Sequence, residues 1–530
     1  MNLALAKNVL ESLARRGVRE LILCSGARNS PMVHVLQEST GFQVYSFFEE
    51  RSAAFYALGR IKSHGHPVAV ITTSGTAAAE LFPAVIESYY TGSPLVLVSA
   101  DRPRKLRGTG APQSIDQVNL FGNHTETFID IAGGETFSLD TWTGHGPLHI
   151  NVCFDEPLID SEVGKIDFRQ EAFRKDNIFR DNTIADHFIE LKNFLSESKR
   201  PVFLIGPLNF DEREAVKEFL LRMKAPVFAE SLSGLREDSD LMPYLLKSGE
   251  PVLSASRFDS LVRIGGIPTV RYWRDIENNA RLISVISVSN FPFSGLSHGK
   301  LIHTDLRKLL AAYDEKTDFD NASLTTILNY DRDQYRKLQQ ILDRETHSET
   351  SLVHRLSLIV EEDATIYLGN SLPIREWDLV ACRERRVCWD MAGNRGVNGI
   401  DGQLSTFLGF ASEDTPNWGV FGDLTTMYDL VSPWALKQRP IKNTRFVVIN
   451  NSGGQIFSRL FKNDDFLNAH NMNFGDWAKM WELGYEKWTA VPQRFTSEEP
   501  TVIEIVPDKM SSQRFWKNYE ELWSAPLRLN

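Results

Sequence analysis

GVFGDL at Gly419–Leu424 and FVVINNSGG at Phe446–Gly454 are the two segments from which the fold of this chain is inferred. Each is a short apolar run that ends in polar residues and glycines, which is typical of a buried β-strand followed by a loop. About 25 residues separate the Gly-Asp pair from the Asn-Asn pair, enough for a helical crossover between parallel strands. Parallel strands end at the same edge of a sheet, and ligands of open α/β sheets bind there.

The residues in these two loops suit a divalent cation and an anionic group. Asp423 supplies a carboxylate, Asn451 an amide oxygen and Gly453 a backbone carbonyl, and hard oxygen atoms are the ligands that Mg²⁺ prefers. The glycines allow the backbone to approach a diphosphate closely. A helix expected to begin near Thr425 adds free N–H groups. Taken singly, Gly-Asp is more often an ordinary turn and Asn-Asn-Ser-Gly-Gly an ordinary loop; their combination at this spacing, each after a strand, favours a functional site.

The same alternation of strand and helix runs along the whole chain and predicts an α/β fold with parallel sheets. At roughly 150 residues per domain, 530 residues suggest about three domains. We expect three successive α/β domains, at 1–182, 183–345 and 346–530. The predicted strands are Glu20–Cys24, Gln43–Phe47, Val68–Thr72, Leu95–Ser99, Pro147–Cys153, Pro201–Ile205, Pro226–Ala229, Ser260–Ile264, Leu282–Val288, Leu301–Thr304, Thr365–Leu368, Arg386–Asp390, Trp418–Phe421, Phe446–Ile449 and Thr501–Ile505. The clearest predicted helices are Arg51–His64 and Ala77–Tyr90, and a linker is expected from about Asp160 to Asn182.

Composition excludes several classes of protein. The net charge is −11 and no long basic run is present, so nucleic acid is not an expected partner. No apolar run reaches the roughly 20 residues that a membrane span needs. Met1–Gly17 is predicted to form an amphipathic helix of a folded domain rather than a signal peptide, which favours the cytoplasm. The four cysteines are expected to be buried reduced thiols: Cys24, Cys153, Cys382 and Cys388.

With this metal motif, the chain resembles the thiamine-diphosphate-dependent enzymes, which carry the motif in their last domain and an essential glutamate in their first. Within that superfamily it is similar to the MenD family, whose motifs match from end to end. The matching segments are SGARNSP (Ser25–Pro31), EERSAAFYALG (Glu49–Gly59), TSGTA (Thr73–Ala77), ADRP (Ala100–Pro103), QSI (Gln113–Ile115), GNSLPIR (Gly369–Arg375), NRGVNGIDGQLST (Asn394–Thr406), GDLTTMYDL (Gly422–Leu430) and NNSGGQIF (Asn450–Phe457).

The resemblance implies three domains: a first that binds the pyrimidine ring of the cofactor, a central one, and a last that binds the diphosphate. It also implies thiamine diphosphate with Mg²⁺ or Mn²⁺ as cofactors. Glu50 matches the essential glutamate, which hydrogen-bonds the cofactor's aminopyrimidine ring and needs a raised pKa. Ile400 matches the apolar wedge under the bent cofactor. Further cofactor contacts are implied for Ser371, Gly422, Leu424 and Gly453, and metal ligands for Asp423, Asn451 and Gly453.

The implied reaction decarboxylates 2-oxoglutarate and adds the succinyl carbanion equivalent 1,4 to isochorismate, in menaquinone biosynthesis. Both substrates are dicarboxylates, and arginine binds a carboxylate through two parallel hydrogen bonds. By motif position the substrate-binding residues are Arg28, Arg102, Gln113, Arg271, Asn370, Ser371, Arg375, Arg395, Ile456 and Phe457. The Arg271 alignment is loose. The resemblance also implies a homodimer or homotetramer with active sites between chains.

Ordinary structural roles compete with these assignments. Glu50 suits a helix cap or an ion pair with Arg51, Ile400 a core residue, and each arginine a surface ion pair. Where the MenD family usually has Cys-Pro-Gly-Ser-Arg, this chain has Ala27 before Arg28, which removes one hydroxyl.

Three other functions are alternatives to this reaction. A related thiamine-diphosphate 2-oxo acid decarboxylase or carboligase with another donor or acceptor shares the metal motif. A non-catalytic scaffold would be expected to lose Glu50, Asp423 or Asn451, and all three are present. A nicotinamide dehydrogenase needs GxGxxG after the first strand, where this chain has SGARNS.

Overall fold

The computed structural model of this chain describes residues 1–162, 164–169, 184–279, 283–385, 387, 389–459, 461 and 463–524. Within these ranges the chain forms three larger sheets, and all of their strand pairs are parallel. The predicted α/β class with successive parallel sheets is confirmed.

The first sheet has six strands in the order β3-β1-β4-β5-β7-β6. Its strands are β1 (Glu20–Cys24), β3 (Gln43–Phe47), β4 (Val68–Thr72), β5 (Leu95–Asp101), β6 (Thr127–Ala132) and β7 (Leu148–Cys153). Its helices are α1 (Asn2–Arg15), α2 (Ser30–Gln37), α3 (Glu50–His64), α4 (Thr76–Ala79) and α5 (Phe82–Thr91). Strands β2 (Ser39–Thr40) and β8 (Ile166–Asp167) form a separate two-stranded parallel sheet.

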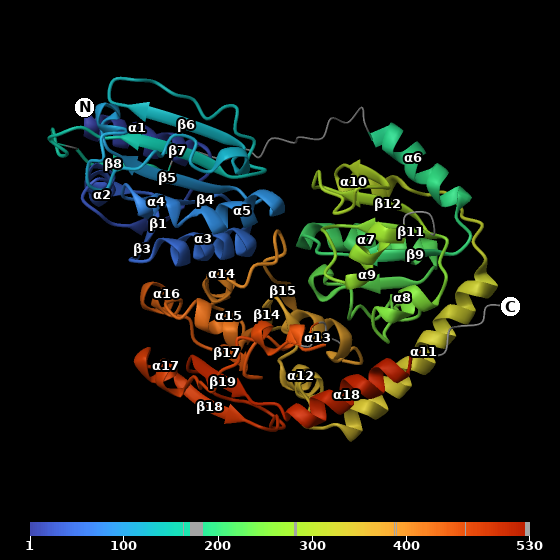
Figure 1. Ribbon diagram of the computed structural model, residues 1–530. Coiled ribbons are helices and arrows are strands. Elements are labelled where there is room, and N and C mark those ends of the chain that lie inside the picture. The colour runs from blue at the N-terminus through green and yellow to red at the C-terminus, as the bar shows by residue number, and fades with distance from the viewer. Residues whose placement is uncertain are drawn as a thin grey trace. The chain divides into compact units, whose positions relative to one another are not determined.

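Helices cover both faces of this sheet (Figure 1). The apolar side chains of α1 and α2 pack on the face that carries Leu21, Leu23 and Ile71. Helices α3 and α5 lie on the other face. The predicted amphipathic helix at the start of the chain is therefore part of a buried core.

The second sheet has five strands in the order β10-β9-β11-β12-β13. They are β9 (Pro201–Ile205), β10 (Val227–Ala229), β11 (Ser260–Ile264), β12 (Ser284–Ser289) and β13 (Lys300–His303). The helices around it are α6 (Ile184–Glu197), α7 (Arg213–Met223), α8 (Pro251–Ala255), α9 (Arg271–Asp275) and α10 (Leu306–Ala312).

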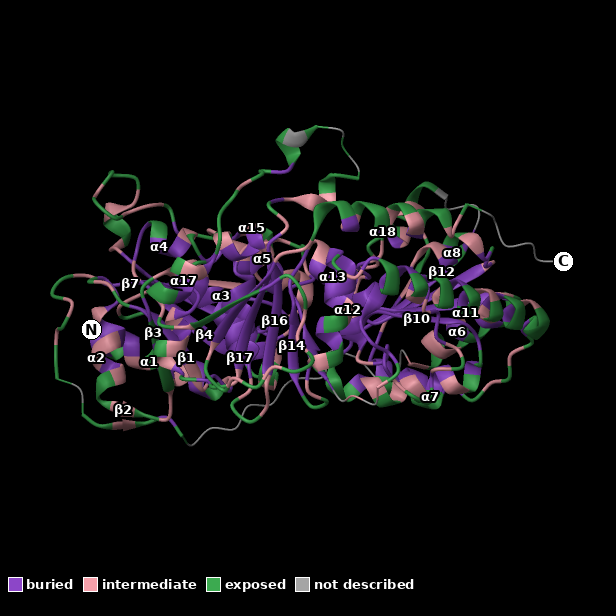
Figure 2. Ribbon diagram, turned by 90° about the horizontal axis from the view of Figure 1, so that it is seen from below, coloured by how far each residue is buried: buried purple, intermediate pink, exposed green. Residues whose placement is uncertain are grey.

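The third sheet has six strands in the order β15-β14-β16-β17-β19-β18. They are β14 (Thr365–Leu368), β15 (Asp390–Ala392), β16 (Asn417–Gly422), β17 (Thr444–Ile449), β18 (Gly484–Trp488) and β19 (Thr501–Ile505). The helices of this region are α11 (Asn321–Arg344), α12 (Glu349–Ile359), α13 (Leu372–Val380), α14 (Gln403–Phe410), α15 (Asp423–Tyr428), α16 (Trp434–Gln438), α17 (Gly475–Met480) and α18 (Lys509–Glu521). Its central strands are buried (Figure 2).

The first and third sheets share one topology. In each, the strand that comes second in the chain lies at one edge, followed by the first, third, fourth, sixth and fifth. Strand β16 thus occupies the place of β4, and β17 the place of β5. The loops after these strands are where the chain's motifs lie.

Contacts divide the chain into two compact units. Unit 1 contains Met1–Ile178, Asn394–Glu413 and Thr425–Lys442, and unit 2 contains Phe179–Gly393, Asp414–Leu424 and Asn443–Asn530. Helix α14 belongs to unit 1, where it packs against α3. The second and third sheets both lie in unit 2.

Several predicted elements need correction. The helix predicted at Ala77–Tyr90 is two helices, α4 and α5, because Pro83 in the first turn of α5 lacks the N–H that a continuous helix requires. The strand predicted at Arg386–Asp390 lies later, as β15, and residues 386 and 388 are outside the described ranges. Most of the predicted linker, 170–182, is also outside them. Strands β6 and β18 were not predicted, because these edge strands lack a continuous buried apolar run.

Two further expectations concern cysteines and membrane spans. Cys24, Cys153 and Cys382 are buried free thiols, as predicted, whereas Cys388 lies outside the described residues. Among the helices of the described ranges, none has both the length and the apolar character that crossing a bilayer requires.

Candidate active site

The two halves of the Gly-Asp and Asn-Asn motif meet in unit 2, at the carboxyl ends of the neighbouring strands β16 and β17. Asp423 is buried and is the first residue of α15. One of its carboxylate oxygens accepts the N–H of Leu424 at 2.6 Å, and the other accepts the N–H of Gly453 at 2.9 Å. Burial raises the pKa of Asp423 above its ordinary value. Its carboxylate therefore ties the loop after β16 to the loop after β17.

Asn451 presents one end of its amide to a protein partner and leaves the other end open. Its Nδ2 donates to Oε1 and Oε2 of Glu349, at 3.0 Å and 2.9 Å. Its Oδ1 is buried and has no hydrogen-bond partner among the described residues. A buried acceptor without a donor is costly unless a ligand completes it. An amide oxygen of this kind fits a divalent cation.

The loop after Asn451 depends on glycine. Gly453 has φ +128°, and a side chain there would overlap the carbonyl oxygen of Leu467. Ile456 and Phe457 follow in the short 3-10 helix η7 (Gln455–Phe457). The ring of Phe457 is partly exposed, so it is available to line an apolar side of the site.

His470 is a neighbour of Asp423 that the sequence motifs do not predict. Its Nε2 lies 3.2 Å from Oδ2 of Asp423, and both side chains are largely buried. A protonated His470 lowers the pKa of Asp423, which opposes the effect of burial. No local motif marks this residue, because it follows η7 at the far end of a loop.

The motif GNSLPIR forms the turn between β14 and α13, also in unit 2. Asn370 is buried at the end of the strand. Ser371 has φ +76°, a backbone conformation that non-glycine residues adopt at a cost and that is common where a ligand is held. Arg375 is exposed, and its Nη1 donates to the carbonyl of Ser371 at 2.6 Å.

Arg271 lies at the start of α9 and is exposed, with its Nε 3.4 Å from Oδ2 of Asp275. Nearby, the carboxylate of Glu250 accepts the N–H of Tyr272 at 3.3 Å. Burial raises the pKa of Glu250, whereas Arg375 lowers it. Arg271 and Arg375 thus both influence the half-buried carboxylate of Glu250, Arg271 through its backbone N–H and Arg375 through its charge, although their sequence positions are distant.

In unit 1, Glu50 is the first residue of α3 and follows strand β3. The helix cap is its neighbour Glu49, whose carboxylate accepts the N–H of Ser52 at 2.8 Å. Glu49 is also the ion-pair partner of Arg51, at 3.7 Å. The two ordinary roles considered for Glu50 are therefore filled by Glu49. Burial raises the pKa of Glu50, and the charges of Glu49 and Glu80 raise it further.

Helix α3 is held in place by α14. A side chain at Gly59 would overlap the carbonyl of Thr406, so the two backbones touch. The hydroxyl groups of Ser52 and Ser405 are 2.7 Å apart across this contact. The half-buried Ile400 lies in the loop before α14 and so shares unit 1 with Glu50.

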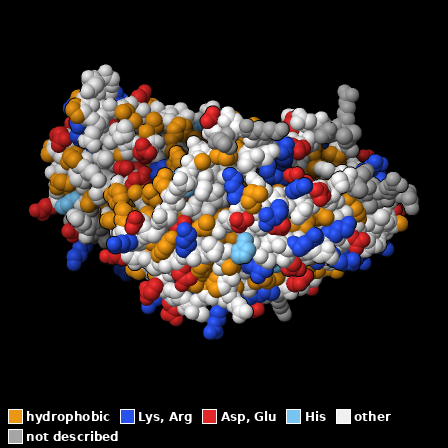
Figure 3. Space-filling view, turned by 60° about the horizontal axis from the view of Figure 1, so that its bottom comes forward, with side chains coloured by type: hydrophobic (Ala, Val, Ile, Leu, Met, Phe, Trp, Pro, Cys, Tyr) orange, Lys and Arg blue, Asp and Glu red, His pale blue; other side chains and the backbone are white. Residues whose placement is uncertain are grey.

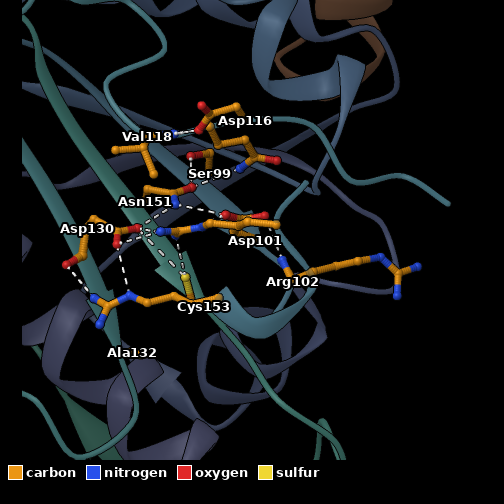
Figure 4. Close-up of polar contacts among 12 residues, drawn as sticks. Ser99, Asp101, Arg102, Asp116, Val118, Asp130, Ala132, Asn151 and Cys153 are labelled. Carbon is orange, nitrogen blue, oxygen red and sulfur yellow. Dashed lines mark hydrogen bonds and ion pairs between the residues drawn. The ribbon is translucent and has the colours of Figure 1, made fainter. Parts of the chain in front are cut away.

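Arg28 and Arg102 follow the strands β1 and β5. Arg28 is buried, and its Nη1 donates to the carbonyl of Phe154 at 3.1 Å and lies 3.2 Å from Oε1 of Glu156. The N–H of Arg102 donates to Asp101 at 2.7 Å, while its side chain extends away from the polar network of Asp101 (Figure 4).

That network fixes the strand ends beside Arg102. Asn151 donates to Asp101 at 3.0 Å and to Asp130 at 2.8 Å, and Arg107 donates to Asp130 at 2.6 Å (Figure 4). Arg107 lowers the pKa of Asp130, which burial raises. Because its carboxylates are internally paired, the network serves as a rigid support rather than as a ligand site.

The last two predicted substrate contacts also lie in unit 1. Gln113 is exposed, and its carbonyl accepts the Ser74 hydroxyl at 2.8 Å. Arg395 is buried. The next two residues, Gly396 and Val397, donate their N–H groups to the buried carboxylate of Glu87 at 2.9 Å and 3.0 Å. Glu87 thereby holds the loop that carries Arg395, a role that no sequence motif indicated.

Within the described ranges, no group of three or more histidine, cysteine, aspartate and glutamate side chains is arranged to hold a metal ion. A cation at Asp423 would instead combine one carboxylate with an amide oxygen and a backbone carbonyl, which is the mixed oxygen set that Mg²⁺ accepts together with phosphate oxygens.

Comparison with known proteins identifies the relatives of this chain. Residues 3–120 match the family model "Thiamine pyrophosphate enzyme, N-terminal TPP binding domain". Two relatives named 2-succinyl-5-enolpyruvyl-6-hydroxy-3-cyclohexene-1-carboxylate synthase, from Bdellovibrio bacteriovorus and Akkermansia muciniphila, are 42% and 35% identical. The alignments cover 98% and 96% of this chain and 99% and 97% of the relatives. A third relative with the same name, from Geobacillus kaustophilus, is 31% identical, and the alignment covers 86% of this chain and 84% of the relative. This chain therefore belongs to the family of 2-succinyl-5-enolpyruvyl-6-hydroxy-3-cyclohexene-1-carboxylate synthases, the MenD family of thiamine pyrophosphate enzymes.

Proposed function

We propose that this protein decarboxylates 2-oxoglutarate and adds the remaining succinyl unit 1,4 to isochorismate, giving 2-succinyl-5-enolpyruvyl-6-hydroxy-3-cyclohexene-1-carboxylate for menaquinone biosynthesis. The observation that carries the proposal is the end-to-end likeness to relatives named for this product. The cluster around Asp423 and Asn451 and the raised pKa of Glu50 are the features that this chemistry needs.

Asp423, Asn451 Oδ1 and the Gly453 carbonyl would hold Mg²⁺ or Mn²⁺, and through it the diphosphate of thiamine diphosphate. When bound, this cofactor supplies the electron sink that stabilises the carbanion left by decarboxylation. The chain positions and tunes it. Gly422, Leu424 and Ser371 would add contacts from the strand ends, and Ile400 would support the bend of the cofactor.

Glu50 would hydrogen-bond the pyrimidine ring. A raised pKa favours the protonated form of this carboxyl group, and burial together with the charges of Glu49 and Glu80 raises the pKa of Glu50. The substrate carboxylates would be bound by arginines and polar side chains: Arg28, Arg102, Gln113, Arg271, Asn370, Ser371, Arg375 and Arg395. Ile456 and Phe457 would line the apolar side.

We further propose a homodimer or homotetramer in which Glu50 of one chain works with Asp423 of another. Large apolar side chains are exposed in unit 1 close in sequence to Glu50 or to the end of α15, namely Phe48 (58%), Tyr428 (51%) and Leu430 (40%). Exposed apolar side chains also occur elsewhere on the surface (Figure 3). Burial of such side chains between subunits is favourable. We also propose three domains: residues 1–182 bind the pyrimidine ring of the cofactor, residues 183–345 form the central domain, and residues 346–530 bind the diphosphate. We propose in addition that the protein works in the cytoplasm.

The test is an assay of CO₂ release from 2-oxoglutarate with thiamine diphosphate and Mg²⁺, run with and without isochorismate. The proposal predicts that isochorismate accelerates CO₂ release and that the carboxylated cyclohexene product forms in equal amount. Release that ignores isochorismate would favour a simple decarboxylase, and the absence of release would favour a different donor or a scaffold.

A further inference from the structure

We infer that Glu349 is a positioning residue for the divalent cation: its carboxylate holds the Asn451 amide with the oxygen turned toward the cation. Glu349 is the first residue of α12, and its side chain is buried. The inference rests on the proposed function, because it takes Asn451 as a metal ligand.

The two ends of an amide are not equivalent for this purpose. Only the oxygen can bind a cation, whereas the NH₂ group would repel it. A carboxylate group accepts hydrogen bonds through its oxygens, and the group that donates to Glu349 is the NH₂ of Asn451. Both oxygens of Glu349 lie within 3.0 Å of that nitrogen. The rotated amide would face the carboxylate with its oxygen and is therefore disfavoured.

Glu349 is itself held in place. Its backbone N–H donates to the Ser512 hydroxyl on α18 at 2.9 Å. Residues that fix the orientation of a metal ligand in this way typically contribute about 10–100-fold to metal affinity. Sequence motifs give no sign of Glu349, which lies 102 residues before Asn451.

The neighbouring Asn450 provides an internal comparison. Its Nδ2 also donates to a buried glutamate, Glu504, at 2.8 Å. Its Oδ1, however, accepts the N–H of Ser452 at 3.3 Å, so both ends of that amide already have protein partners. Of the two successive asparagines, only Asn451 leaves a buried oxygen without a partner among the described residues.

The experiment measures Mn²⁺ affinity by electron paramagnetic resonance of the full chain with thiamine diphosphate and without substrates. Glu349→Leu removes the acceptor, and we expect it to weaken Mn²⁺ binding by about 10–100-fold. Glu349→Gln keeps one acceptor oxygen and should retain most of the affinity. Asp331→Asn is the matched control, because Asp331 is also buried and accepts the N–H groups of Lys247 and Ser248, at 2.9 Å and 3.0 Å, rather than the Asn451 amide. Its Mn²⁺ affinity should equal that of the parent.

An exchange of the two side chains guards against a variant that fails to fold. Asn451→Asp alone places two carboxylates in contact and should bind Mn²⁺ weakly. In the double variant, Asn451→Asp with Glu349→Gln, the amide introduced at position 349 donates to the carboxylate introduced at position 451. The second oxygen of that carboxylate faces the cation, so Mn²⁺ binding should recover. Failure of this recovery in a folded protein would overturn the inference, as would an equal loss in Asp331→Asn.

A separate variant tests the assumption beneath the inference. If Asn451→Ala leaves Mn²⁺ affinity unchanged, the proposed metal site is wrong, and the inference is overturned with it. If Asn451→Ala weakens binding but a folded Glu349→Leu variant does not, the metal site stands and only the role of Glu349 is refuted.

Discussion

Asp423, Asn451 and Glu50 differ in how much of each side chain the protein already uses. Both oxygens of Asp423 accept backbone N–H groups, so its position is fixed before any ligand binds. Asn451 keeps one buried oxygen without a partner among the described residues. Glu49, rather than Glu50, caps helix α3, and the pKa of Glu50 is raised. Each residue is thus prepared for a different task.

The role of Glu50 is tested by Glu50→Gln. Glutamine keeps the size of the side chain but cannot exchange a proton, and we expect turnover to fall by about 10²–10⁴-fold. Thiamine diphosphate affinity, measured by titration, should change little, because the metal site holds the diphosphate. The matched control is Glu49→Gln, which keeps an acceptor oxygen for the Ser52 N–H and should lose far less turnover than Glu50→Gln, because Glu49 influences the pKa of Glu50 only through its charge. A parental rate in Glu50→Gln would refute the assignment.

Ala27 is where this chain departs from the usual family motif. The residue is exposed at the end of β1, next to Arg28. Ala27→Ser restores a hydroxyl, and one hydrogen bond to a charged group contributes about 1.5–3 kcal/mol. We expect the KM of one of the two substrates to fall about tenfold or more with little change in kcat. Unchanged KM values for both 2-oxoglutarate and isochorismate would contradict this expectation.

The sequence predicts the residues that lie in compact motifs and misses those that act across long separations. Asp423, Asn451 and Gly453 could be predicted because each follows an apolar strand. Glu349, His470 and Glu87 could not, since each supports a motif from a distant element through one or two hydrogen bonds or an ion pair. Residues of that kind become visible only when the backbone has brought them together.

Among the elements, α3 has the most demanding surroundings. It carries Glu50 at its first residue and is buried along most of its length, between the first sheet and α14. Gly59 of α3 and Gly409 of α14 lie where the two backbones touch. The orientation of Glu50 therefore depends on a contact that only glycine permits.

Gly59→Ala tests this contact. The added methyl group meets the backbone of α14, and overpacking of this kind costs about 1–3 kcal/mol. Urea unfolding should show that loss, accompanied by a fall in turnover as α3 shifts. Ser63→Ala, at an exposed position of the same helix, should change neither quantity. Parental stability in Gly59→Ala would show that the helices are not in close contact.

Most of the strands that the sequence predicts to the residue are buried, namely β1, β4, β9, β11, β14 and β19. The edge strand β3 also matches fully, although only Tyr45 and Phe47 of its side chains are buried. The edge strands β6 and β18 were missed because their side chains are largely accessible and lack an apolar run. A break between two helices is harder to predict from the sequence, since a proline such as Pro83 is compatible either with a kink in one helix or with the first turn of a new helix.

At the scale of the whole molecule, stability should depend on the protonation of a buried histidine. His149 in β7 is fully buried against Ser99, and burial lowers its pKa to about 3. Between pH 6.5 and 3 the unfolded chain therefore binds a proton that the folded chain does not. Stability contributed by this site is present above pH 6.5 and falls by about 1.4 kcal/mol per pH unit below it.

The variant His149→Gln removes this titration. Between pH 7 and pH 5 its free energy of unfolding should fall by about 2 kcal/mol less than that of the parent, as measured in urea. His347→Gln, at an exposed position, should keep the parental dependence on pH. Identical slopes in His149→Gln and the parent would mean that His149 is accessible to protons in the folded state.

The first and third sheets repeat one strand order, yet they offer different groups at their strand ends. In the first, Glu50 follows the second strand in chain order; in the third, Asp423 and Asn451 follow the third and fourth. We propose that one thiamine diphosphate is held by both kinds of end, with each subunit contributing one of them.

The most direct measurement of that proposal is complementation between two inactive variants. Glu50→Gln and Asp423→Ala are co-expressed with different affinity tags, and the mixed oligomer is isolated and assayed. If each active site takes Glu50 from one chain and Asp423 from the other, the mixed dimer contains one intact site, and we predict half of the parental activity. A mixed dimer as inactive as either variant alone would contradict the account.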